Sequence, residues 1–417
     1  MDKLNRRAEL FFQKHCKHRN VLVAYSGGVD SLVLLQLAKN YLHGNITAIH
    51  INHGVQDQAA LWETHCRKVT DALEIPLITE HAGFAALPDT DPENTLREAR
   101  HALYSRHMGS DDILLTAHHQ DDQAETVLLQ LLRGAGPRGL SAMPAIKKFG
   151  NGWHGRPLLF ATRAEIHEYA VMHQLVWMED PSNTDTRFTR NWLRHEILPQ
   201  LENRLKNTTV VLARVADNCA ASENLLDEFL SAEVLACRGL TPATLSVTKL
   251  LERPETLQAG ILRAWLKAAP PRKKLQQIQK DMLHAGEDRA PHAFIGDWEM
   301  RRYRDDLYFM QRLLPHDATQ IIPWDAKTPL EISGAGILQP FEFSETFVSC
   351  ADPVTVRFRI GGEILYDPKR GQHQCLKKIF QQKGIPPWQR DRMPLIYKGE
   401  KLAGLGQVTN GCERSLW

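Results

Sequence analysis

The sequence predicts a chain of the α/β class that begins with a parallel sheet, continues with a mainly helical domain and ends in a small α+β domain. Short apolar runs alternate with amphipathic helical patterns over about the first 200 residues. Helical periodicity dominates the next stretch, and an alternation typical of strands marks the last. These changes of pattern predict domains at 1–205, 206–325 and 345–417.

The first domain is predicted from four apolar runs that each precede a helical pattern. Strands are expected at 21–25, 46–51, 75–80 and 112–117, and helices at 31–40, 57–73, 92–108 and 121–132. This order indicates a parallel sheet covered on both faces, in which ligands bind beyond the carboxyl ends of the strands. Three polar motifs fall at such ends: SGGVDS (26–31), HINHG (50–54) and AHHQDD (117–122). We expect them to meet in one crevice.

After the first domain, the sequence shows first helical periodicity and then the alternation typical of strands. Residues 212–235 indicate one long helix and 252–268 an amphipathic one, while 298–310 alternates aromatic and charged residues as a strand pair would. The Pro/Gly-rich passage around 315–340 is expected to be a linker or loop. Several short β-type runs follow from about 345.

The cysteines and the lack of long apolar runs indicate the cellular compartment of the protein. The 417 residues carry a formal net charge of +2 and seven cysteines with no C-x-x-C pair. An odd, irregularly spaced set of cysteines indicates reduced thiols. No apolar run approaches the roughly 18 residues of a membrane span, and the charged N-terminal stretch lacks the apolar centre of a signal peptide. We expect a cytoplasmic protein with no membrane partner.

The motif SGGVDS has the chemistry of a phosphate-binding loop. It comprises Ser26, Gly27, Gly28, Val29, Asp30 and Ser31. The two glycines let backbone N–H groups turn toward an anion, the serines add hydroxyl donors, and the following helix directs its positive end at the site. The pattern is neither G-x-x-x-x-G-K-[ST] nor G-x-G-x-x-G. A plain strand-to-helix turn is the alternative.

A second cluster of polar residues begins the helix predicted at 121–132. Asp121 or Asp122 lies three or four positions before Glu125, so the carboxylates share a face. Carboxylates there can bind Mg²⁺ or a cationic amine. The alternative is a solvated helix start, at which acids are favoured by the helix dipole.

SGGVDS between a strand and a helix resembles the PP-loop of the ATP pyrophosphatase family, which has a Rossmann-like, adenine nucleotide hydrolase-like fold. The block LLTAHHQDDQAETVLLQLLRGAGPRGLSAM (114–143) resembles the tRNA(Ile)-lysidine synthetase family within that group. Further matches follow in chain order: INHG (51–54), EAR (98–100) with Tyr104, RPLL (156–159), WMEDPSN (177–183) and TRNWLRHEILP (189–199). The segment 389–404 fits an appended family domain more loosely. One departure is Leu103, which stands where the family pattern has a second arginine.

The resemblance implies a ligase that uses ATP to adenylate the wobble cytidine of a CAU-anticodon tRNA(Ile), after which free L-lysine displaces AMP to give lysidine. From the residue types we expect the loop and His53 to bind ATP, and Asp30 and Asp121 to hold Mg²⁺. Arg100 would stabilise charge at the α-phosphate. Asp122 and Glu125 are candidates to position the lysine amine. His53 or His119 would assist proton transfer, or else be structural.

Basic residues predict contacts with tRNA. Arg187, Arg190 and Arg194 fall near one helical face and suit phosphates, although a solvated basic face is an equal alternative. From residue 350 onward twelve Lys/Arg oppose six Asp/Glu. Within that tail we single out Trp388 for stacking and Arg390 and Arg392 for phosphates. A homodimer is one option for the assembly.

Three other functions compete with this hypothesis. A tRNA thiolase with the same loop would need paired cysteines, which the spacing does not provide. A metal phosphohydrolase is conceivable from the group His50, His53, His118, His119, Asp121 and Asp122, but it leaves SGGVDS unexplained. A non-catalytic RNA-binding protein explains the tail and not the predicted crevice.

Overall fold

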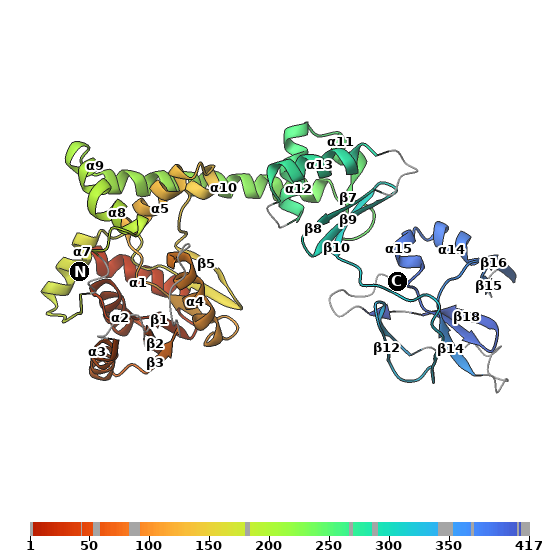
Figure 1. Cartoon of the computed structure of the whole chain (residues 1–417), viewed down its shortest axis with the longest axis horizontal. Coiled ribbons are helices and arrows are strands. Elements are labelled where there is room, and N and C mark those ends of the chain that lie inside the picture. Colours follow the sequence, from red (N-terminus) through yellow and green to blue (C-terminus); the bar gives the residue numbers. More distant parts are fainter. Residues whose placement is uncertain are drawn as a thin grey trace. The chain divides into compact units, whose positions relative to one another are not determined.

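The computed structural model describes residues 3–42, 44–52, 59–82, 92–179, 184–266, 270–285, 291–340, 353–367, 371–406 and 408–409. The chain forms two compact units, 1–228 and 229–417 (Figure 1). No helix in these described ranges is long and apolar enough to cross a membrane.

Unit 1 is built on a six-stranded sheet in the order β3-β2-β1-β4-β6-β5. Its strands are β1 (Val21–Ala24), β2 (Ile46–Asn52), β3 (Leu77–His81), β4 (Ile113–Leu115), β5 (Ile146–Phe149) and β6 (Gly152–Gly155). β3, β2, β1, β4 and β6 run parallel, and β5 pairs antiparallel with β6. The predicted four-stranded parallel sheet is confirmed, and the hairpin β5–β6 extends it beyond the prediction.

Both faces of this sheet are covered by packed side chains. Successive side chains of β1 point to opposite faces and enter two different hydrophobic clusters. Val21 and Val23 face a core with α1, α2, α3 and α7, whereas Leu22 packs in a second cluster that includes Met108. The helices of this part are α1 (Lys3–His15), α2 (Val29–Tyr41), α3 (Ala59–Ala72), α4 (Pro92–Arg106), α5 (Gln120–Leu132), α6 (Pro137–Leu140) and α7 (Arg163–Met172).

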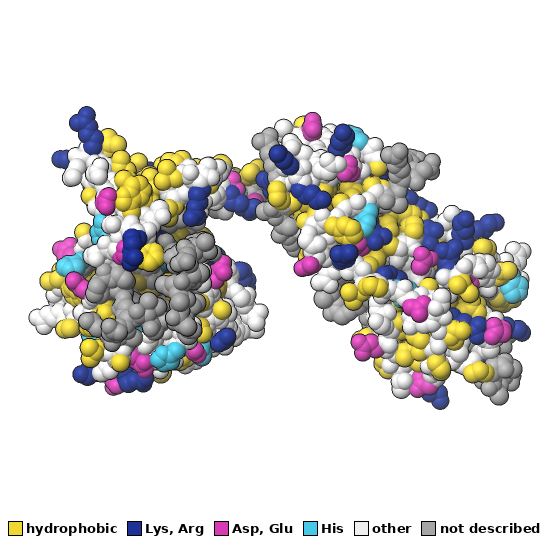
Figure 2. Space-filling view, in the orientation of Figure 1, with side chains coloured by type: hydrophobic (Ala, Val, Ile, Leu, Met, Phe, Trp, Pro, Cys, Tyr) yellow, Lys and Arg dark blue, Asp and Glu magenta, His cyan; other side chains and the backbone are white. Residues whose placement is uncertain are grey.

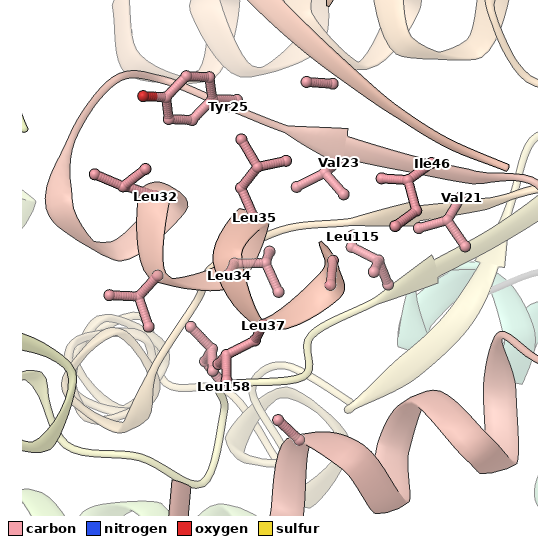
Figure 3. Close-up of a cluster of buried hydrophobic side chains, with 14 of the residues drawn as sticks. Val21, Val23, Tyr25, Leu32, Leu34, Leu35, Leu37, Ile46, Leu115 and Leu158 are labelled. Carbon is pink, nitrogen blue, oxygen red and sulfur yellow. The ribbon is translucent and has the colours of Figure 1, made fainter. Parts of the chain in front are cut away.

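The packing of α2 on β1 fixes the connection between them. Figure 3 shows side chains of α2 directed at β1, β2 and β4. Leu34, Leu35 and Leu37 have no exposed surface. Burying a leucine contributes about 1.5–3 kcal/mol, so the helix is held firmly against the strand. The loop 26–31, whose last three residues form the first turn of α2, is therefore anchored at both ends.

Unit 1 ends in a helical segment with one widened turn. It comprises α8 (Thr189–Trp192), the π-helical turn η2 (Leu193–Ile197), α9 (Leu198–Arg204) and the start of α10 (Thr208–Ala236). The Leu198 N–H donates to the Leu193 carbonyl, five residues earlier. Such turns are frequent at functional sites. The long helix expected at 212–235 is confirmed as α10.

The first part of unit 2 combines helices with a four-stranded sheet in the order β7-β10-β9-β8. Its elements are β7 (Leu245–Ser246), α11 (Val247–Leu251), α12 (Glu255–Leu266), α13 (Arg272–Leu283), β8 (His292–Ile295), β9 (Trp298–Tyr303) and β10 (Asp306–Gln311). The predicted strand pair at 298–310 is confirmed, with Tyr303 opposite Asp306. Met300 and Leu307 are fully buried against the helices.

The second part of unit 2 is rich in short strands. They are β11 (Ile322–Pro323), β12 (Leu330–Ile332), β13 (Gly336–Leu338), β14 (Val354–Arg357), β15 (Ile364–Asp367), β16 (Gln372–Cys375), β17 (Leu395–Lys398), β18 (Lys401–Leu405) and β19 (Val408–Thr409), with helices α14 (Leu376–Gln382) and α15 (Pro387–Arg390). The expectation of a linker or loop over 315–340 is wrong. β12 and β13 pair as a hairpin, and β13 also pairs with the distant β19, which local turn signals do not reveal.

Candidate active site

The loop 26–31 leaves the carboxyl end of β1 and enters α2 through Gly28. Ser31 Oγ accepts from the Ser26 N–H at 3.1 Å and donates to the Gly28 carbonyl at 2.9 Å. The two serine hydroxyl oxygens are 3.0 Å apart. These bonds close the loop on itself and tie it to the first turn of α2, whose N-terminal end favours anions.

Gly27 is the position in this loop that no other residue can occupy without strain. Its φ is +88°, and a Cβ built there would lie 2.6 Å from Trp62 Nε1. That indole donates to the Ser26 carbonyl at 2.8 Å, and the Met178 N–H donates to the Gly27 carbonyl at 3.0 Å. At Gly28, by contrast, a Cβ would meet only Ser26 Oγ at 3.5 Å. The backbone requirement thus falls on the first glycine.

His119 lies among three carboxylates at the same edge of the sheet. It is 2% exposed, with Nε2 3.8 Å from Asp30 Oδ2 and 3.6 Å from Asp122 Oδ2, and with Nδ1 3.5 Å from Asp121 Oδ2. Burial alone would lower the pKa of His119, but the surrounding carboxylates, Asp122 foremost, raise it. The first and third sequence motifs therefore do meet at one edge of the sheet, whereas the second, HINHG, extends outside the described residues.

Asp30 and Asp121 differ in what else they contact. Asp121 Oδ2 accepts from the Arg163 N–H at 2.9 Å. The other oxygen of Asp30, Oδ1, is buried and has no hydrogen-bond partner among the described residues. Burial raises the pKa of Asp30. Within the described part of the chain, no group of three or more His, Cys, Asp or Glu side chains is arranged to hold a metal ion.

Glu125 is fully buried on α5 and is bound by two arginines of the helical segment that contains η2. Arg190 Nε donates to its Oε2 at 2.8 Å, and Arg194 Nε donates to its Oε1 at 2.6 Å. Arg194 Nη2 also donates to Asp122 Oδ1 at 2.8 Å. Two carboxylates and two guanidinium groups thus form one network, in which both oxygens of Glu125 are engaged.

This network sets the charge at this edge of the sheet. Burial alone would raise the pKa of Asp122, but His119 and the two arginines lower it well below its usual range. The sequence pattern makes Arg190 and Arg194 candidates for tRNA phosphates and Glu125 a candidate for the lysine amine. The structure shows these groups paired with one another, and the sequence holds no signal of that pairing beyond their charges.

Four further residues at this edge do not stand out from the sequence as a group: Thr116, His118, His154 and Arg156. Thr116 Oγ1 lies 2.7 Å from His118 Nδ1 and 2.8 Å from His154 Nε2. Arg156 donates to His154 Nδ1 at 3.2 Å. Burial lowers the pKa of His118 to about 3. Arg156 begins the RPLL match, which is the signal that could have found them.

Other predicted residues fall in separate places. Arg100 is half-buried on α4, and Leu103 of the same helix is buried. Arg187 is exposed and pairs with Asp185 at 2.7 Å. His53 lies outside the described residues.

Trp388, Arg390 and Arg392 engage in contacts within unit 2. Trp388 is 9% exposed and meets the Tyr308 ring edge-on, with centroids 5.3 Å apart. Arg390, equally buried, donates to the Tyr303 hydroxyl at 2.8 Å. Arg392 donates to the carbonyls of residues 314 and 334. A role in tRNA binding stays a prediction for all three, and it would require this packing to open.

Exposed cations of the same unit lie elsewhere. Figure 2 shows Lys and Arg side chains gathered over α14. On that helix and directly after it Lys377, Lys378 and Lys383, which we call the α14 lysines, are exposed. They are better placed for phosphate contact than the buried arginines of α15 and its surroundings.

A closed glycine loop at the carboxyl end of the first strand of a parallel sheet, facing a carboxylate–histidine cluster, defines a PP-loop nucleotide-binding protein. The PP-loop domain family model matches residues 1–201. Two further models match beyond it, the TilS substrate binding domain at 245–308 and the TilS substrate C-terminal domain at 354–412. The chain belongs to the tRNA(Ile)-lysidine synthase family, so it is a ligase that forms a carbon–nitrogen bond.

The sequences of two curated relatives support this membership. The tRNA(Ile)-lysidine synthase of Coxiella burnetii is 38% identical over 92% of this chain and 87% of its own length. That of Shigella flexneri is 36% identical over 94% of this chain and 92% of its own length. Among solved structures, a U34-tRNA thiolase from Methanococcus maripaludis is similar over 52% of this chain and 77% of that chain, with 17% identity and a TM-score of 0.44.

Proposed function

We propose that the protein uses ATP to adenylate the wobble cytidine of CAU-anticodon tRNA(Ile) and then joins L-lysine to C2 of that base, releasing AMP and diphosphate. The observation that carries the proposal is the meeting of the SGGVDS loop and the HHQDD motif at one sheet edge, in a chain of this family. Neither motif alone requires this reaction, but together they supply an anion cradle and buried charges.

The adenylation half-reaction needs the pyrophosphate held and its charge balanced. The loop N–H groups and serine hydroxyls suit the phosphates, and Arg100 remains our candidate for charge at the α-phosphate. Mg²⁺ is expected with the nucleotide. Asp30, whose Oδ1 is buried without a partner among the described residues, fits one of its ligands, and phosphate oxygens would complete the set. The ion would neutralise the departing pyrophosphate.

The transfer half-reaction needs the lysine amine placed beside the activated base. Asp122 and Glu125 supply negative charge there, but Arg190 and Arg194 already neutralise it. We propose that the arginine pair holds these carboxylates in position, and that the amine binds against the edge of the network rather than displacing it. His119, inside the carboxylate cluster, remains a candidate for proton transfer.

Four further features stay proposals: the domain division, the tRNA contacts, the compartment and a homodimer. A division into domains at 1–205, 206–325 and 345–417 agrees with the spacing of the three family models. We propose that the α14 lysines contact tRNA phosphates, and that the enzyme acts in the cytoplasm. A homodimer remains an option.

The test is incubation of the purified chain with ATP, labelled lysine and unmodified tRNA(Ile) transcript. We expect label in the RNA and one AMP released per label, with an elongator methionine tRNA transcript as the matched control. Label without ATP, or AMP release without labelled RNA, would overturn the proposal. Phosphoester hydrolysis in the absence of ATP would instead support the phosphohydrolase.

A further inference from the structure

A chain of hydrogen bonds runs from the buried end of β6 to the start of α5. Arg156 follows β6 and donates from Nη1 to the Pro144 carbonyl at 2.7 Å and from Nη2 to His154 Nδ1 at 3.2 Å. His154 Nε2 lies 2.8 Å from Thr116 Oγ1, and this oxygen lies 2.7 Å from His118 Nδ1. The chain thus reaches the residue next to the carboxylate cluster.

The direction of the first bond is forced by chemistry. A guanidinium group only donates, so Nδ1 of His154 must accept. His154 is 2% exposed, and its burial together with the Arg156 charge keeps the ring neutral by lowering its pKa. A neutral imidazole carries one proton, which must then be on Nε2. His154 therefore donates to Thr116.

The direction of the second bond depends on where the Thr116 hydroxyl proton can go. The hydroxyl has one proton to donate, and its oxygen accepts from His154 with one of its two lone pairs. The remaining described partner is His118 Nδ1 at 2.7 Å, which accepts if its ring is neutral. Burial keeps that ring neutral at physiological pH by lowering its pKa. The single proton of His118 is then on Nε2, at the opposite edge of the ring from Thr116.

We propose that Arg156, His154 and Thr116 are positioning residues that fix His118 as an Nε2–H hydrogen-bond donor next to the carboxylate cluster. Each residue along the chain from Arg156 to His118 donates to the next one. Arg156 is itself anchored by its hydrogen bond to the Pro144 carbonyl. A donor held in this way costs no reorganisation when substrate binds. It also has a chemical consequence: an Nε2 that already carries a proton cannot act as a general base.

The role of the donor rests on the function proposed above. His118 interacts electrostatically with Asp122. It directly precedes His119, whose Nε2 is 3.8 Å from Asp30 of the phosphate-binding loop, so the Nε2–H of His118 would donate to an acceptor oxygen of the bound substrates. The tautomer itself does not depend on that function. It can be measured in the free enzyme, so a failure of the relay and a failure of the proposed reaction are distinguishable.

The test is ¹⁵N NMR of the full chain labelled at histidine, in which the two ring nitrogens report directly which one is protonated. His118→Gln and His154→Gln spectra assign the two rings. In the wild-type protein we expect both rings neutral at pH 7 with the proton on Nε2. A wild-type His118 protonated on Nδ1, or charged, would overturn the relay without any further variant.

Substitutions then test whether Thr116 acts through its hydroxyl group or only through its packing. Thr116→Val keeps the shape but removes the hydroxyl, and we expect His118 to lose its single tautomer; Thr116→Ser should restore it. Thr79→Val is the matched control, because the Thr79 hydroxyl is buried with no partner among the described residues. We expect kcat for lysine incorporation to fall about tenfold in Thr116→Val with little change in KM for lysine. An unchanged His118 tautomer in that variant would overturn the relay.

Discussion

Replacing Glu125 by glutamine tests whether the arginine–carboxylate network holds the helical segment 189–204 in place. The glutamine keeps the volume but removes the charge that two guanidinium groups share, at 2.6 and 2.8 Å. Breaking a buried ion pair by removing one partner costs about 3–5 kcal/mol. Glu125 is fully buried, but the arginine side chains remain 27% and 22% exposed, so we expect the lower end, about 3 kcal/mol.

Hydrogen exchange read by mass spectrometry measures this locally. We expect the protection of η2 amides to fall about a hundredfold, because 1.4 kcal/mol corresponds to a factor of ten. The matched control is Glu299→Gln, which removes a buried carboxylate bound to Arg301 at 3.0 Å in unit 2. That variant should loosen β8 and β9 and leave η2 unchanged. Full protection of η2 in Glu125→Gln would refute the reasoning.

Three further predictions concern the loop, the pH response and the tRNA surface. Gly27→Ala should raise the KM for ATP much more than Gly28→Ala, since only the first Cβ collides with the Trp62 indole; equal effects in ATP titrations would contradict this. Burial and the Arg156 charge lower the pKa of His154 to about 2 in the folded protein, so the unfolded chain binds more protons below about pH 6.5. Stability should therefore fall as the pH drops from 6.5 to 5, by up to about 1.4 kcal/mol per pH unit, and thermal unfolding of His154→Gln should show a flatter dependence. Replacing the three α14 lysines by alanine should lower the salt slope of tRNA binding by about 0.7–0.9 for each phosphate that is no longer neutralised, and an unchanged slope would remove these lysines from the interface.

The parts of the fold that the sequence predicts are those set by local pattern. Apolar runs such as 21–25 and 46–51 are short, contain β-branched residues and alternate with helical patterns, which predicts strands. A parallel sheet then places the carboxyl ends of these strands together. That rule alone is enough to predict that the SGGVDS loop and the HHQDD motif lie at one edge of the sheet. Even the glycine pair is recognisable, although only the structure shows that Gly27, with its positive φ, carries the backbone requirement.

Side-chain partners could not be predicted in the same way. Arg190 and Arg194 look like a basic face when placed along a regular helix. The π-helical turn changes the angular spacing of the segment, and both guanidinium groups meet Glu125, 65 and 69 positions away in the chain. The sequence shows which residues are charged, but it does not show which of them form ion pairs. The same limit hid the relay to His118, whose members come from the ends of two different strands.

The packing around Trp388 decides how tRNA recruitment should be tested. Deleting the chain from about residue 345 would remove Trp388 and Arg390, which contact Tyr308 and Tyr303 of the preceding sheet. Tyr308 is 8% exposed in the full chain, so the truncated protein would present a new aromatic surface where that packing was. Weaker tRNA binding after truncation would then report damaged folding as readily as the removal of phosphate-binding groups. Point substitution of the α14 lysines avoids this, because exposed side chains make recruitment separable from the integrity of unit 2.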